Sequence, residues 1–85
     1  MVRRSRVEIL AYILETAIGG SNKTKIVYST NINFKVLNEN LELLIDRKFI
    51  EVFGKQFITT KLGMEFLEIY KKMTGLLDLE RIRIQ

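Results

Sequence analysis

The stretch SNKTKIVYSTNINFKVLNENLELLIDRK, residues 21–48, decides the fold of this 85-residue chain. Its first part predicts a short helix that runs through Thr30, because Ser21 or Asn22 can cap a helix N-terminus. The Asn-Ile-Asn sequence of residues 31–33 predicts a tight turn, since asparagine tolerates the left-handed backbone region. The stretch therefore opens with a helix followed by a turn.

The remainder of the stretch predicts a second helix. Asn33 can cap it, and we expect it to end near Arg47 or Lys48, since cations are favourable at a helix C-terminus. Apolar residues at helical spacing mark its buried side: Val36, Leu37, Leu41, Leu44 and Ile45. Two helices joined by a short turn are therefore expected.

A further helix is predicted before this pair, over residues 3–18. Its apolar positions recur at three and four residues: Val7, Leu10, Ala11, Leu14 and Ile18. Gly19 and Gly20 end it, because glycine tolerates a left-handed cap. The chain thus begins with three helices.

A hairpin and a last helix are predicted after the pair. Residues 49–53 and 56–59 have strand-like composition, and the turn between them centres on Gly54. Thr60 is a suitable cap for the last helix, and we expect Thr74-Gly75 to kink or interrupt it. The predicted fold class is α+β, mainly α, with the order ααα-ββ-α and an extended C-terminal helix.

Length and composition limit the possible functions. The chain has room for one compact domain, and it contains no Cys and no His. Disulfides and thiolate or imidazole metal ligands are thereby excluded, and the usual catalytic bases, nucleophiles and phosphate loops are missing. We expect no enzyme activity, no metal, no cofactor and no small-molecule substrate. The apolar fraction of 47% favours a dimer, because it is high for so small a core.

The net charge of +4 is compatible with a phosphate-bearing partner, but it is also common among proteins that bind no anion. No apolar run approaches the ~20 residues of a membrane span, so no membrane partner is expected. The N-terminus lacks a clear signal-peptide cleavage site. The expected location is cytoplasmic, either at a nucleoid or, for a viral protein, in the host.

Helix, turn, helix and hairpin together form a helix-turn-helix with a wing, in which the second helix of the pair enters the DNA major groove. The candidate DNA contacts are exposed polar, aromatic or basic positions on these elements and on the N-terminus: Arg3, Arg4, Lys23, Lys25, Tyr28, Asn33, Lys35, Asn38, Glu39, Lys55 and Gln56. Taken singly, Lys23, Lys25 and Lys55 are better explained as solvated side chains, and only their joint placement around one surface favours DNA contact. Arg3 and Arg4 are equally well explained as a frayed end, and Tyr28 as a ring packed under the turn.

The last helix carries an apolar stripe that is wider than one small core requires. Its members are Leu62, Phe66, Ile69, Tyr70, Met73, Leu76 and Leu77. Much of the stripe fits the a/d spacing of a coiled coil, which predicts a homodimer, although it could also cover its own subunit's core. We therefore assign residues 1–60 to a DNA-binding winged domain and residues 61–85 to a dimerisation helix.

These segments, with the 41–50 run LELLIDRKFI and the 59–63 run TTKLG, resemble small archaeal winged-helix DNA-binding proteins. Within that group they resemble the ten-kilodalton chromatin-type proteins of Sulfolobus-like archaea and related viral and plasmid regulators. The resemblance implies a homodimer whose last helices pair as an antiparallel coiled coil. It also implies double-stranded DNA as the partner, contacted by the third helix and the wing.

The third helix departs from that pattern, because Glu39, Glu42 and Asp46 lie on the side expected to face DNA. Carboxylates repel phosphate, although a glutamate can accept a hydrogen bond from cytosine. Two functions remain open: a transcription regulator or chromatin-type protein that binds duplex DNA, and a winged-helix adaptor that binds another protein without DNA.

Overall fold

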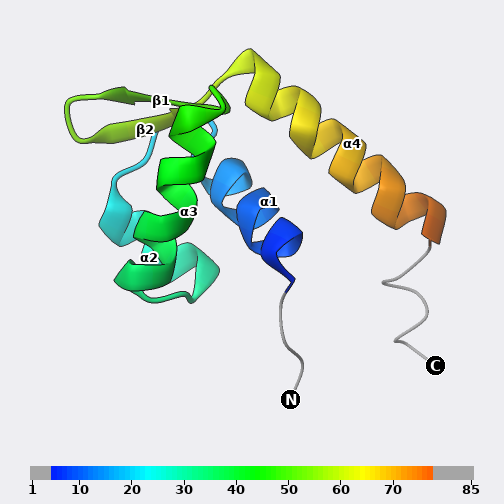
Figure 1. Ribbon diagram of the computed structural model, residues 1–85, viewed down its shortest axis with the longest axis horizontal. Helices are drawn as coiled ribbons and strands as arrows, with labels where there is room; N and C mark the ends of the chain where they lie inside the picture. The colour runs from blue at the N-terminus through cyan, green and yellow to red at the C-terminus, as the bar shows by residue number, and fades with distance from the viewer. Residues whose placement is uncertain (1–4, 78–85) are drawn as a thin grey trace.

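The computed structural model describes residues 5–77 and confirms the predicted order of elements (Figure 1). It contains α1 (Arg6–Thr16), α2 (Lys23–Thr30), α3 (Phe34–Asp46), β1 (Ile50–Phe53), β2 (Gln56–Thr59) and α4 (Lys61–Leu77). Helices α1, α2 and α3 pack together beneath the hairpin, and α4 extends away from them on the other side (Figure 1). The fold is therefore α+β and mainly helical, as expected.

Asparagine caps set the ends of the helix-turn-helix. The side chains of Asn22 and Asn33 each accept a 2.8 Å hydrogen bond, from the backbone N–H of Lys25 and of Val36 respectively. These bonds satisfy N–H groups that have no partner inside the helix. Asn31 ends α2 in the left-handed region, with φ at 59°. The predicted caps and the predicted turn are thus all present.

The first helix is shorter than the expected span of residues 3–18. Ser5 caps α1 by accepting from the Glu8 N–H, and the helix ends at Thr16. Two of the apolar positions that defined the helical spacing, Val7 and Ile18, are exposed. Val7 lies in the first turn of α1, beyond the edge of the core, and Ile18 follows the end of the helix.

The core lies among α1, α2, α3 and the base of the hairpin. It is built from aliphatic side chains: Leu10, Ala11, Ile13, Leu14, Ala17, Ile26, Leu37, Leu41, Leu44, Ile50 and Leu67. No sulfur belongs to it within the described residues, where the methionines Met64 and Met73 lie exposed on α4. Burying such side chains contributes about 1.5–3 kcal/mol each, so this cluster is the main source of stability.

The hairpin is fixed in register by its core-facing side. Ile50 pairs with Thr59, and both are buried, whereas Phe53 pairs with Gln56 at the far end. Ser21 adds an antiparallel bridge to Phe57, through reciprocal backbone hydrogen bonds of 3.0 and 2.8 Å. The loop before α2 therefore extends the two-stranded sheet and holds the wing against the helix-turn-helix.

The first turns of α4 pack against the core, and the rest of the helix extends away from it. Thr60 caps it by accepting from the Gly63 N–H, and Leu67 is buried. One ion pair, between Lys71 Nζ and Glu15 Oε1 at 3.0 Å, joins α4 to α1. The expected break at Thr74-Gly75 is not found, since the helix continues through both residues to Leu77. A single glycine costs about 1 kcal/mol, which the surrounding helix tolerates.

None of the helices between residues 5 and 77 combines the length and the apolar character that crossing a membrane requires.

Candidate nucleic-acid interface

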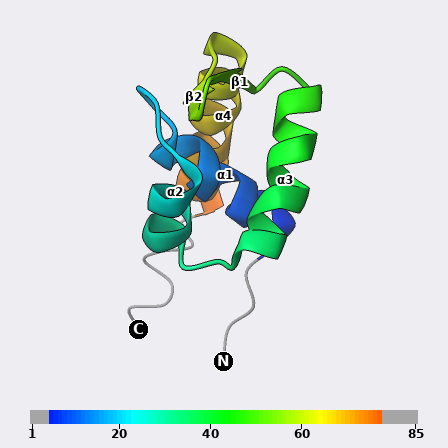
Figure 2. The ribbon, with the colours of Figure 1, turned by 90° about the vertical axis from the view of Figure 1, so that its left-hand side faces the viewer.

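A concavity lies between the start of α2, the middle of α3 and strand β2. It encloses about 280 Å³ and is lined by Lys23, Asn38, Leu41, Glu42, Ile45 and Phe57. Figure 2 shows this side of the molecule, where α2 and α3 lie below the hairpin. Two of the predicted contact residues, Lys23 and Asn38, are thus brought to one surface although they lie on different helices.

Lys23 is positioned at this concavity by the hairpin. Its Nζ lies 5.9 Å from the centroid of the Phe57 ring, within the range of a cation–π interaction. The side chain is half-buried, so it is more restrained than an ordinary surface lysine. A restrained cation loses less side-chain entropy when it meets a phosphate, which makes Lys23 a better anion contact than its sequence position alone indicates.

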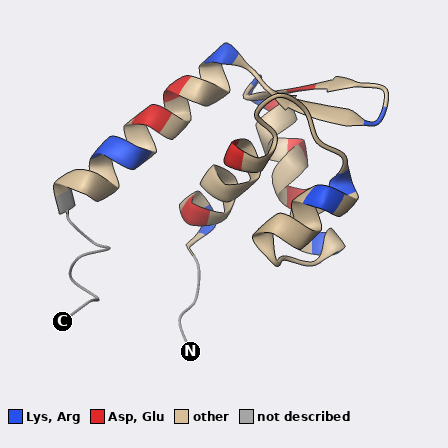
Figure 3. Ribbon diagram, turned by 180° about the vertical axis from the view of Figure 1, so that it is seen from behind, with Lys and Arg blue, Asp and Glu red and all other residues tan. Residues whose placement is uncertain are grey.

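The outer face of α2 carries a cation and an aromatic ring. Lys25 and Tyr28 are both exposed and lie three residues apart, on one side of the helix. The Tyr28 side chain is 82% exposed, which excludes the interpretation in which its ring packs under the turn. Figure 3 shows the basic positions of α2 and of the hairpin turn at the end of the molecule remote from the end of α4.

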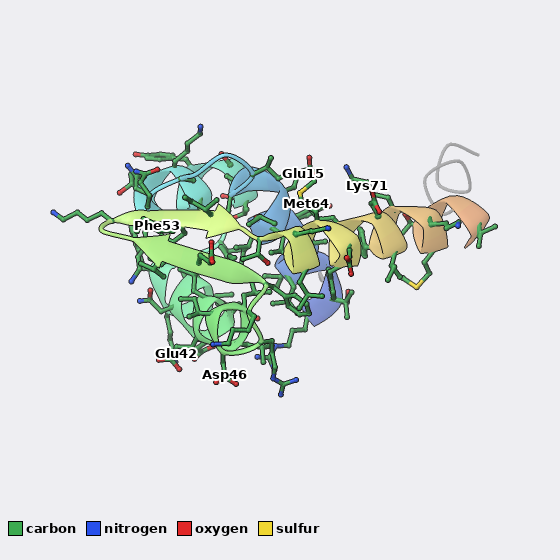
Figure 4. The ribbon with its side chains drawn as sticks, turned by 90° about the horizontal axis from the view of Figure 1, so that it is seen from above. Glu15, Glu42, Asp46, Phe53, Met64 and Lys71 are labelled. Atoms are coloured by element: carbon green, nitrogen blue, oxygen red, sulfur yellow. The ribbon has the colours of Figure 1, made fainter. Side chains whose placement is uncertain are left out.

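The outer face of α3 carries one basic residue at its start and acidic residues after it. Lys35, Glu39, Glu42 and Asp46 are exposed and follow one another at spacings of four, three and four residues, which is one side of a helix. In Figure 4, Glu42 and Asp46 project from α3 away from the hairpin. One cation is therefore followed by three carboxylates on this face. Only the start of α3, from Phe34 to Asn38, is free of acidic side chains and suited to approach phosphate.

The predicted residues on α3 border two different concavities at the edges of this outer face. Asn38 and Glu42 border the concavity that contains Lys23, whereas Glu39 borders a second concavity, of about 470 Å³, together with Arg6, Ile9 and Asn40. Glu39 thus lies at the edge of the outer face nearer to α1, and Asn38 and Glu42 lie at the edge nearer to α2. Asn33 already uses its side-chain oxygen to cap α3, so its amide nitrogen is the group left to donate elsewhere.

The N-terminal basic segment is only partly described. Arg6 Nε donates a 3.2 Å hydrogen bond to Asn40 Oδ1, and Asn40 Nδ2 donates in turn to the Val36 carbonyl. Arg6 is therefore held against α3 and contributes to the packing of α1. Arg3 and Arg4 lie outside the described residues.

The hairpin presents a cation at its tip. Lys55 is exposed in the turn, beside Gly54, whose φ of 60° permits the tight bend. Gln56 is exposed but reaches back over the loop before α2, because a Cβ placed on Gly20 would lie 3.2 Å from its Oε1. Lys55 is thus the better placed of the two predicted hairpin contacts.

Three residues on or near the candidate interface escaped the sequence analysis. Phe57 restrains Lys23, the buried Asn40 anchors Arg6, and Phe53 exposes 60% of its surface near the hairpin tip. The alternation of side chains along β1 gives a signal for Phe53, since Ile50 faces the core and residues 51 and 53 then share the other face. Nothing local indicates the partners of Phe57 or Asn40, which are distant in sequence.

The apolar stripe of α4 divides into two sides. Phe66 and Tyr70 pack against the subunit's own core. The centroids of the Phe66 and Phe49 rings lie 5.4 Å apart. The outward side consists of large exposed apolar residues: Leu62, Ile69, Met73 and Leu76. The side chain of Leu77 lies outside the part of the chain that the structure describes. Within residues 5–77, no cluster of three or more acidic side chains is arranged to hold a metal ion.

Comparison with known proteins agrees with this architecture. No curated protein matches the sequence significantly. Among solved structures, the chain is similar to that of Sso10a-2, a DNA-binding protein from Sulfolobus solfataricus, with a TM-score of 0.73 at 20% identity. That match covers 95% of this chain and 93% of the other. The family model described as winged helix-turn-helix matches residues 3–78. The expected architecture is thereby confirmed, and this chain belongs to the winged helix-turn-helix family.

Proposed function

We propose that this protein binds double-stranded DNA as a homodimer and acts as a transcription regulator or chromatin-type protein, without catalysing a reaction. The observation that carries the proposal is the shared surface of Lys23 and Asn38, which borders the base of a hairpin whose tip exposes Lys55. Family membership and the DNA-binding description of Sso10a-2 support the same function.

The surface has the parts that duplex recognition requires. Lys23, Lys25 and Lys55 supply cations for phosphates. Tyr28 exposes its ring on the outer face of α2, on the same side as Lys25. Asn38 is exposed on α3 beside Lys23, where its amide has the geometry to pair with the N6 and N7 edge of adenine. We assign phosphate positioning to the lysines and base reading to Asn38, with Lys35 as a second contact on the same half of α3.

The acidic residues of α3 favour selective over general DNA binding. Glu39, Glu42 and Asp46 repel phosphate wherever α3 lies deep along the groove. An orientation that inserts only the start of α3, from Phe34 to Asn38, reduces this repulsion. We infer that the protein discriminates between DNA sequences and does not coat DNA uniformly.

The outward side of α4 supports the homodimer. Leu62, Ile69, Met73 and Leu76 recur at spacings of seven, four and three residues, which is the repeat of a coiled-coil seam. Ile69 and Leu76 are 69% and 82% exposed in the single chain. A second α4 running antiparallel against this side would bury all four residues.

Binding of a fluorescently labelled random-sequence duplex, measured by anisotropy at several salt concentrations, tests the proposal. We expect the dissociation constant to rise steeply with salt, since each contacted phosphate contributes about 0.9 to the logarithmic slope. Sedimentation of the protein alone and with the duplex gives the stoichiometry. Binding that is absent, or that does not change with salt, would reject duplex DNA as the partner.

The acidic side of α3 favours one alternative, an adaptor that binds a basic protein without DNA. Lys35 is the only cation among the four outward residues from Lys35 to Asp46, so this side suits a cationic partner. Capture of a specific protein by a chain that has no measurable duplex affinity would support the adaptor. Loss of that capture in Glu42→Gln would assign it to α3.

A further inference from the structure

Phe34 is the first residue of α3 and directly follows the cap Asn33. It exposes 49% of its surface, and it belongs neither to the core nor to the partly buried apolar residues that pack against the core. An aromatic residue is also only a moderate helix former. The fold alone therefore does not account for a phenylalanine at this position.

Phe34 lies on the side of α3 that borders the concavity of Lys23. Asn38 follows it by four residues, so the two exposed side chains are neighbours along one side of the helix. Asn38 in turn lines the concavity together with Lys23. The segment from Phe34 to Asn38 contains Lys35 and no carboxylate. The start of α3 thus combines an apolar ring and an amide with nearby cations.

A duplex offers such a ring one apolar group in the major groove. The base-pair edges there carry hydrogen-bond donors and acceptors, apart from the C5-methyl group of thymine. A phenylalanine ring that covers a donor or an acceptor leaves it without a partner, which is unfavourable. Contact with the methyl group instead removes apolar surface from water on both molecules. An apolar residue at the start of a groove-entering helix therefore favours thymine.

We propose that Phe34 contacts the C5-methyl group of thymine in the major groove and is a specificity-determining residue of this protein. The inference rests on the proposed DNA binding and names the base that the start of α3 selects. Asn38, on the same side of the helix, is suited to adenine, the base that pairs with thymine. Phe34 and Asn38 together select A·T base pairs.

Competition between two labelled duplexes tests the methyl contact. One is an alternating adenine–thymine duplex, and the other has deoxyuridine in place of each thymidine, which removes only the methyl group. Equal amounts are mixed with limiting protein, and the ratio of the two dyes in the bound fraction gives the ratio of affinities. We expect the wild-type protein to favour the thymine duplex about fourfold for each methyl group contacted, the effect of burying one such group.

Variants of Phe34 should change this ratio in a graded way. Phe34→Ala should bind the two duplexes equally, whereas Phe34→Leu keeps an apolar side chain and should retain part of the preference. Because both duplexes compete for one protein sample, the ratio does not depend on the fraction of a variant that is folded. Asn38→Ala should weaken binding to both duplexes and leave the ratio unchanged.

Phe53→Ala is the matched control. Phe53 exposes 60% of its surface, but the strand register places it on the face of the hairpin opposite to Phe57, which lines the concavity. Removing this equally prominent ring should change neither the affinity nor the ratio. A ratio that falls equally in Phe34→Ala and Phe53→Ala would overturn the assignment to α3.

The same methyl group occurs on 5-methylcytosine, so a second comparison distinguishes the two sources. An alternating guanine–cytosine duplex, with or without 5-methylcytosine, competes with the adenine–thymine duplex. We expect the adenine–thymine duplex to bind most tightly, because guanine lacks the edge that Asn38 is suited to pair with. Tightest binding to the methylated guanine–cytosine duplex would overturn thymine as the target.

The remaining outcomes separate this inference from the proposed function. Equal binding of the thymine and uracil duplexes by the wild-type protein would overturn the methyl contact and leave DNA binding intact. A preference that persists in full in Phe34→Ala, or binding to random-sequence DNA without binding to the adenine–thymine duplex, would do the same. A wild-type protein that binds neither duplex at low salt would overturn both proposals.

Discussion

The hydroxyl of Thr59 donates a buried 2.6 Å hydrogen bond to the backbone carbonyl of Leu14. This bond joins the end of β2 to the last turn of α1, where helix carbonyls need partners from outside the helix. The Thr59 N–H donates at 3.1 Å to the Ala17 carbonyl, so one residue supports the end of α1 twice. The hairpin is consequently positioned by the helix on which the core is built.

Replacing this hydroxyl should destabilise the protein. Thr59→Val keeps the shape of the side chain but leaves the Leu14 carbonyl without its donor, which we expect to lower the free energy of unfolding by about 1–3 kcal/mol. Chemical denaturation followed by circular dichroism measures the change. Thr24→Val is the matched control, because Thr24 is exposed on α2, and it should alter stability by less than about 0.5 kcal/mol.

The same substitution at two glycines of α4 should have opposite effects. A Cβ at Gly63 would collide with the carbonyl oxygen of Phe49, which is itself held by a 3.0 Å bond from the Thr60 N–H. Gly63→Ala should therefore destabilise the fold by about 1–3 kcal/mol. A Cβ at Gly75 meets no atom within 4 Å, so Gly75→Ala should stabilise the helix by about 0.5–1 kcal/mol.

Melting temperatures of the two variants, measured side by side, check this pair. If alanine at Gly63 does not destabilise the fold, α4 packs less closely against the Phe49 carbonyl than the structure shows. A destabilising alanine at Gly75 would show that another chain approaches the helix there.

Local sequence signals predicted the elements well, because their determinants are local. Asn22, Asn31 and Asn33 define the helix-turn-helix through caps and a left-handed turn, each acting within three residues. The exposure of Val7 could not be predicted, since it depends on where α1 emerges from the packed core. Gly75 was expected to interrupt α4, but a helix that is already formed absorbs the cost of one glycine.

The sequence predicted which residues belong to the candidate site better than it predicted how they are arranged. Periodicity placed Lys35 and Asn38 outward, and both are exposed. The contact between Lys23 and Phe57 joins residues of α2 and β2, so only the fold brings it about. The divergence of Asn38 and Glu39, adjacent in sequence, also needs the positions of α1 and α2 as references.

Removing single lysines should change the salt dependence of duplex binding. Lys23→Ala, Lys25→Ala and Lys55→Ala should each reduce the logarithmic slope by about 0.9 for every phosphate that the variant no longer neutralises. Lys72→Ala is the matched control, because Lys72 is exposed on α4, away from the proposed surface. Slopes that remain unchanged in all three variants would move the DNA contact to another face.

Neutralising Glu42 should strengthen binding to random-sequence DNA. Glu42 borders the concavity that contains Lys23, so its carboxylate lies near the phosphates that this lysine is proposed to contact. We expect Glu42→Gln to lower the dissociation constant roughly two- to fivefold, the effect of an exposed charge interaction of about 0.5–1 kcal/mol. Glu65→Gln, on α4, should leave the dissociation constant unchanged. Equal dissociation constants for the two variants would place α3 away from DNA.

A charge on the outward side of α4 should separate the proposed dimer. Ile69→Glu places a carboxylate at the most central of the exposed apolar positions, where pairing would bury it without a partner. We expect sedimentation equilibrium to show mainly monomer. Tyr28→Ala removes an equally prominent exposed side chain from α2 and should leave the association unchanged. A wild-type protein that sediments as a monomer would contradict the assignment.

The placement of sulfur in this molecule determines its response to oxidants. Within residues 5–77 the core is entirely aliphatic, whereas Met64 and Met73 stand at the surface of α4. Peroxide would reach both thioethers and convert them to polar sulfoxides, while leaving that interior chemically untouched. Oxidative damage should therefore spare the aliphatic core. Its effect on pairing should come from Met73, which belongs to the face that we assign to pairing, and a reductase that repairs methionine sulfoxide should reverse it.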